Sequence, residues 1–132
     1  MSFSWDSFLV YAQKLDRDGL DECYYRSGVS RAYYAAFHCA EEYIAKNNIT
    51  VIEYDASGKK LKAHEKVWLT LQKEKDFIVR KIGTDGYGIR SERTRSDYDC
   101  DCCIDRKTLK KVCDKAQKII DSCKELTASH FV

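Results

Sequence analysis

The chain of 132 residues contains no proline, the residue that most often interrupts a helix, so its helical segments can run long. The longest periodic segment extends from Asp21 to Lys46. Its apolar residues recur at steps of three and four, which places them on one side of an α-helix. They are Val29, Ala32, Tyr33, Ala36, Phe37, Ala40, Tyr43 and Ile44. The pattern therefore predicts a helix of about seven turns that buries one face.

Similar spacing predicts further helices over residues 4–15, 62–74, 76–82 and 89–98, and a closing helix capped by Asp105. Residues 83–88 include three glycines, and we expect a break or a mobile loop there. No segment has the alternation of a strand, and no linker or repeat divides the chain. We predict an all-α, antiparallel up-and-down bundle of four to five helices that forms a single domain over residues 1–132.

Composition narrows the classes of protein to consider. No apolar run approaches the roughly eighteen residues of a membrane span, and the N-terminal residues lack the basic and apolar regions of a secretory signal. The seven cysteines are an odd number, so we expect reduced thiols and a cytoplasmic protein. The net charge of +2 neither favours nor excludes a nucleic-acid partner.

Residues 100–103 hold three cysteines and are the only group in the sequence with metal-like spacing. A closed zinc site takes four ligands, usually from two separated pairs, and no second pair follows. We therefore expect free thiols at this segment, and neither a metal nor another cofactor.

Arg31 and His38 stand seven residues apart in the long predicted helix. Seven residues are close to two turns, so both side chains fall within about 20° of each other around the axis. They lie away from the apolar stripe, with Tyr34 on the turn between them. A helix that only buries one face has no need of this polar pair.

Residues 31–40 have the pattern Arg31-x-Tyr33-Tyr34-Ala35-x-Phe37-His38-x-Ala40. Two further patterns follow along the chain: His64 near the start of a predicted helix, and Arg90-x-x-Arg93-x-x-Ser96-Asp97-Tyr98 before the closing helix. In this order the patterns resemble the HEPN superfamily of small helical domains found in higher eukaryotes and prokaryotes.

The resemblance implies a helical bundle that forms a homodimer. Many members are metal-independent RNA-cutting enzymes that act as toxins or in phage defence, often encoded beside a small nucleotidyltransferase. Other members are non-catalytic, with nucleotide or protein binding proposed. The cutting members carry an arginine, four to six residues and then a histidine, and Arg31 and His38 meet that spacing.

Metal-free RNA cleavage uses the ribose 2′-hydroxyl as nucleophile, and it needs an acid/base near neutrality and a cation for the phosphate. His38 suits the first task and Arg31 the second, with Tyr34 or Ser27 as auxiliary donors. We expect Arg90 and Arg93, one helical turn apart, to contact RNA phosphates.

Structural roles are the alternative for the same residues. Arg31 could pair with another helix, and His38 could hydrogen-bond to a neighbouring one. Arg93 and Asp97 are four residues apart, so a surface ion pair is their default role.

Three functions are consistent with these observations. The first is an RNA-acting toxin or defence component of the endoribonuclease type. The second is a non-catalytic helical dimer that binds a nucleotidyltransferase partner or a nucleotide, and the third is a purely structural dimerisation domain. The sequence lacks the glycine-rich phosphate loop of an ATPase and the recognisable spacing of a Ser/His/Asp hydrolase.

Overall fold

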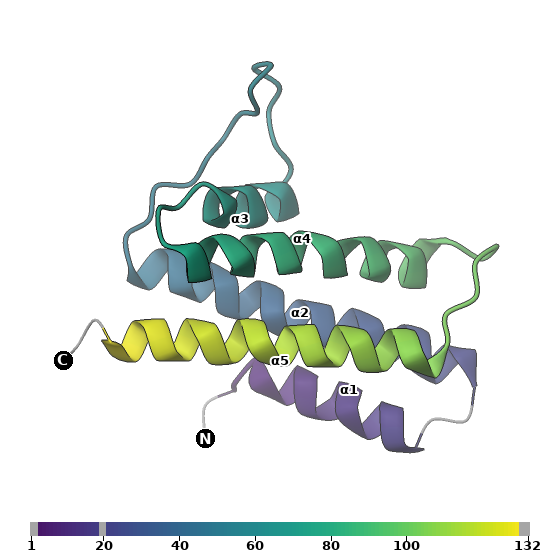
Figure 1. Cartoon of the computed structure of the whole chain (residues 1–132). Helices are drawn as coiled ribbons and strands as arrows, with labels where there is room; N and C mark the ends of the chain where they lie inside the picture. Colours follow the sequence, from purple (N-terminus) through teal and green to yellow (C-terminus); the bar gives the residue numbers. More distant parts are fainter. Residues whose placement is uncertain (1–2, 19–20, 130–132) are drawn as a thin grey trace.

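The computed structural model describes residues 3–18 and 21–129, which form five α-helices (Figure 1). They are α1 (Asp6–Asp18), α2 (Glu22–Lys46), α3 (Ala63–Gln72), α4 (Phe77–Tyr98) and α5 (Arg106–Ser129). Within the described ranges no strand occurs, and an isolated bridge joins Tyr54 to Lys60. The predicted all-α class is confirmed.

The four long helices alternate in direction, and the short α3 lies beside α4 at one edge of the bundle (Figure 1). The parallel pair α2 and α5 forms the centre. Gly28 in α2 faces Leu109 in α5 so closely that an added Cβ would lie 2.7 Å from Leu109 Cδ1. On the side of this pair away from α3 and α4, α1 runs antiparallel to α5 (Figure 1). Ion pairs join Asp16 to Arg106 and Asp6 to Lys124.

The caps explain why α2 and α5 begin where the sequence predicts. The Asp21 side chain accepts hydrogen bonds from the backbone N–H groups of Cys23 and Tyr24. The Asp105 side chain accepts one from the backbone of Thr108, at 2.9 Å. Each carboxylate satisfies N–H groups that have no partner within the first helical turn.

The predicted break over residues 83–88 is wrong, because α4 continues through all three glycines. Gly83 and Gly86 face α3. A Cβ at Gly83 would lie 2.6 Å from the Trp68 carbonyl oxygen, and a Cβ at Gly86 would lie 2.2 Å from the indole ring of Trp68. These glycines therefore allow α3 and α4 to pack closely and do not interrupt the helix.

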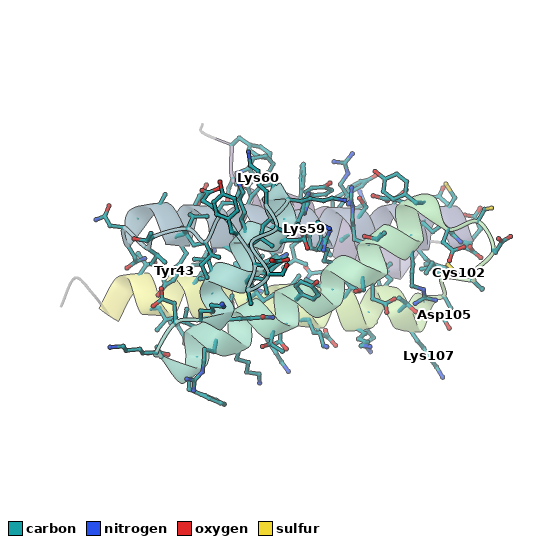
Figure 2. The ribbon with its side chains drawn as sticks, turned by 90° about the horizontal axis from the view of Figure 1, so that it is seen from above. Tyr43, Lys59, Lys60, Cys102, Asp105 and Lys107 are labelled. Carbon is teal, nitrogen blue, oxygen red and sulfur yellow. The ribbon has the colours of Figure 1, made fainter. Side chains whose placement is uncertain are left out.

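Core side chains come from all five helices and form one buried cluster. The largest of those with almost no exposed surface include Trp68 of α3, Tyr33 of α2, Ile89 of α4 and Leu109 of α5. Burial of this kind stabilises a protein by about 1.5–3 kcal/mol per large apolar side chain. Residues 47–62 loop away from the bundle and return the chain to the start of α3, with Lys59 and Lys60 on the returning part (Figure 2).

Replacing Gly86 by alanine tests the close packing of α3 on α4. The new methyl group would overlap the Trp68 ring, so Gly86→Ala should lower the free energy of unfolding by about 2 kcal/mol or more. Gly88→Ala is the matched control, because Gly88 lies in the same helix with open space at its Cβ position. It should stabilise the helix by up to about 1 kcal/mol. Urea denaturation measures both, and equal effects would contradict the packing described here.

Candidate functional site

His38 lies on α2 against the start of α1, where its imidazole stacks on the indole of Trp5 with ring centroids 3.6 Å apart. Its Nδ1 is 2.9 Å from Oε1 of Glu41, one turn further along α2. A carboxylate can only accept, so Nδ1 carries the hydrogen and the neutral ring leaves Nε2 unprotonated. The side chain is 26% exposed. His38 therefore offers an accessible lone pair of the kind that a general base needs.

Arg31 also rests on α1. Its guanidinium lies 4.9 Å from the ring centroid of Phe8, and that ring packs edge-on against Trp5. The two residues predicted as a catalytic pair thus lie along the same α1–α2 seam, each against a different aromatic ring. Arg31 remains exposed to solvent.

Tyr34 turns from α2 toward α4, where its hydroxyl accepts a hydrogen bond of 2.6 Å from Arg93 Nη2. The Arg93 guanidinium lies over two aromatic rings, 5.0 Å from the centroid of Tyr34 and 5.5 Å from that of Tyr98. Arg93 Nε is 2.9 Å from Asp97 Oδ2, although its N–H does not point at that oxygen, so the contact is ionic. The predicted pairing of Arg93 with Asp97 is confirmed.

Arg90, one turn earlier on α4, differs from Arg93. Its guanidinium lies 5.9 Å from the ring centroid of Tyr87, and no acidic residue in the described ranges forms an ion pair with it. Of the two arginines predicted to contact phosphate, Arg93 already interacts with Tyr34 and Asp97. The positive charge of Arg90 is not neutralised by an ion pair within the described ranges.

His64 joins these residues from α3, although the sequence did not place it in the site. Its Nδ1 is 2.6 Å from the buried hydroxyl of Tyr33, which also accepts a hydrogen bond of 3.0 Å from Trp68 Nε1. Its ring stacks on Phe37 at a centroid distance of 4.4 Å and meets the Tyr34 ring edge-on at 5.9 Å. The sequence offered one indication of this role for His64: a buried tyrosine hydroxyl and a buried indole N–H need polar partners.

Burial lowers the pKa of His64 below its usual 6.5, and the positive charges of Arg93, Arg90 and His38 lower it further. Burial also raises the pKa of Tyr33, which keeps its hydroxyl protonated. Together α2, α3 and α4 bring two imidazoles and two guanidiniums to one side of the bundle. We call this group the histidine face; it consists of Tyr34, His38, His64, Arg90 and Arg93.

The cysteine-rich segment lies at the α4–α5 connection, where Cys102 and Asp105 are close to one end of the bundle (Figure 2). The Arg26 guanidinium fixes this connection by donating to the carbonyl oxygens of Asp99 and Cys102, at 2.9 and 2.6 Å. All seven cysteines are free thiols. Across residues 3–18 and 21–129, no group of three or more His, Cys, Asp or Glu side chains is arranged to hold a metal ion.

Comparison of the chain with protein-family models, curated proteins and solved structures finds no match. None of the helices in the described part of the chain is both long and apolar enough to cross a membrane.

The lowered pKa of His64 predicts a pH effect on stability. The folded protein favours the neutral imidazole more than the unfolded chain does. The contribution of neutral His64 to the free energy of unfolding is therefore fully present above pH 6.5, and it is lost as the pH falls through the lower pKa of the folded state.

Tyr33→Phe removes the hydroxyl that favours the neutral ring, and should raise the pKa of His64 in an NMR titration. Tyr34→Phe is the control and should leave the ring below its usual range. A His64 that titrates at 6.5 or above in the wild type would contradict this prediction.

Proposed function

We propose that the protein is an RNA-acting component of the HEPN type, a metal-independent endoribonuclease that serves as a toxin or defence factor. The observation that best supports this proposal is the arrangement of His38. Its Nδ1–H is held by a carboxylate and its Nε2 is free, while Arg31 lies toward α1 and Arg93 lies toward α4. Metal-free cleavage of a phosphodiester needs this combination of proton acceptor and cations.

In the proposed reaction His38 Nε2 accepts the proton of a ribose 2′-hydroxyl within hydrogen-bond reach, about 2.6–3.2 Å. The 2′ oxygen forms a bond to phosphorus while the bond from phosphorus to the 5′ oxygen breaks. The departing oxygen takes a proton from water, so the products are a 2′,3′-cyclic phosphate and a 5′-hydroxyl end. The imidazolium that forms on His38 is stabilised by the negative charge of Glu41.

The cations have separate tasks in this proposal. Arg31 lies on the same seam as His38, and its planar fork can hold the phosphate that is attacked. Tyr34 and Arg93 are hydrogen-bonded to each other, so their main contribution is to keep the α2–α4 side of the histidine face rigid. Positioned donors of this kind stabilise the charge that develops on the phosphate oxygens.

A cleavage assay tests the proposal. Purified wild-type protein with single-stranded RNA and a chelator should release 2′,3′-cyclic phosphate ends, and His38→Gln should lower the rate by about 10²-fold or more because the base is lost. Glu41→Gln should lower it less, about tenfold, since the base at Nε2 remains while the carboxylate that orients the ring and stabilises the imidazolium is lost. Glu42→Gln is the matched control: this exposed neighbour has no hydrogen bond to His38. Equal cleavage by the wild type and His38→Gln would exclude this function.

A second candidate is a non-catalytic helical dimer that binds a nucleotidyltransferase partner or a nucleotide. Exposed apolar side chains favour it: Phe77 and Ile78 at the start of α4 are 70% and 49% exposed, and Val10 and Tyr11 on α1 are 63% and 50% exposed. A homodimer or a docked partner would cover such residues. In the cleavage assay this candidate predicts intact RNA with every variant.

A further inference from the structure

The hydrogen bonds around Tyr33 determine which nitrogen of His64 carries the proton. The indole N–H of Trp68 can only donate, so the Tyr33 oxygen accepts from it. The single hydroxyl hydrogen of Tyr33 then has His64 Nδ1 as its acceptor, at 2.6 Å. Nδ1 is therefore unprotonated, and the neutral ring carries its hydrogen on Nε2. This is the opposite tautomer to that of His38, whose Nδ1 faces a carboxylate.

The Nε2–H of His64 points away from the core. Tyr33 is fully buried and holds the opposite edge of the ring, whereas His64 itself is partly exposed. No residue in the described ranges hydrogen-bonds to Nε2, and the buried unpaired side-chain atoms are Arg93 Nε and Ser96 Oγ. The structure thus presents a fixed, neutral hydrogen-bond donor to solvent.

The packing register of α3 and α4 brings Arg90 alongside this donor. The two helices are antiparallel, with Gln72 donating to the Gly83 carbonyl and Gly86 lying against Trp68 (Figure 1). His64 is one turn before Trp68, and Arg90 is one turn after Gly86. Both residues are therefore displaced in the same direction along the bundle, and the charge of Arg90 is near enough to lower the pKa of His64.

We propose that His64 and Arg90 together bind one phosphate group of the RNA backbone, His64 by donating its Nε2–H and Arg90 through its positive charge. This inference rests on the proposed function, because it takes RNA as the ligand. Two features distinguish the pair from structural residues: among residues 3–18 and 21–129, none hydrogen-bonds to the outward donor and no acidic residue forms an ion pair with the cation. Arg93 offers neither feature, since Tyr34 and Asp97 occupy it.

The two contacts should differ in their response to salt. A neutral donor releases no counterion, whereas an arginine on a phosphate does, with a slope of about 0.7 in log affinity against log salt for single strands. Removing Arg90 should therefore flatten the salt dependence of RNA binding. Removing the His64 donor should weaken binding by a similar factor at every salt concentration.

The test measures binding of a short single-stranded deoxyuridine oligonucleotide, which carries the phosphates but lacks the 2′-hydroxyl that would be the nucleophile. Arg90→Ala should weaken binding about tenfold at low salt and reduce the salt slope by about 0.7. His64→Asn keeps an acceptor for Tyr33 but has no donor at the Nε2 position, and should weaken binding about three- to tenfold with the slope unchanged. His64→Gln, whose amide reaches further, should recover part of the loss.

Arg80→Ala is the matched control. Arg80 lies on the same helix over Phe77 at 5.9 Å, the same arrangement as Arg90 over Tyr87, but it is near the other end of α4. Its removal should leave the affinity within about twofold of the wild type.

The outcomes separate this inference from the function on which it rests. If the wild type cleaves RNA, the phosphate site is wrong in two cases: when the wild type does not bind the oligonucleotide, and when His64→Asn and Arg90→Ala bind it as tightly as the wild type. In both cases the endoribonuclease proposal stands. If the wild type neither binds the oligonucleotide nor cleaves RNA, both proposals fail. A loss with Arg80→Ala equal to that with Arg90→Ala would show general charge attraction and would also overturn the site.

Discussion

The structure depends on one buried side chain, the indole of Trp68. Its ring packs against the backbone of α4 at Gly86, and its N–H donates to Tyr33 of α2, so it joins three helices. The ten residues of α3 are too few to form a stable helix alone in water. Trp68 therefore holds α3 in the bundle, and with it His64, which is one turn away on the same helix.

The two histidines show how a neighbour decides what an imidazole can do. Glu41 accepts from Nδ1 of His38 and leaves a lone pair at Nε2, whereas Tyr33 donates to Nδ1 of His64 and leaves a hydrogen at Nε2. Both rings pack against Phe37, at centroid distances of 5.3 and 4.4 Å. One face of the bundle thus holds a proton acceptor and a neutral donor close together, which is the chemistry on which both proposals are built.

Local patterns in the sequence predicted what depends on neighbours along the chain. The course of α2, the cap at Asp105 and the pairing of Arg93 with Asp97 follow from steps of three and four residues. The course of α4 could not be predicted in this way, because its glycines are explained only by the Trp68 ring from another helix. His64 was missed as a site residue for the same reason, since its partner Tyr33 is 31 residues away.

Hydrogen exchange of the two tryptophan indole N–H groups tests the central role of Trp68 most directly. The indole N–H of Trp68 is buried and bonded to Tyr33, so it should exchange only through global unfolding, with a free energy of exchange equal to the free energy of unfolding. Trp5, which is partly exposed, serves as the internal reference and should exchange much faster. A Trp68 indole that exchanges as fast as that of Trp5 would show that α3 opens independently of the bundle, and would contradict this account.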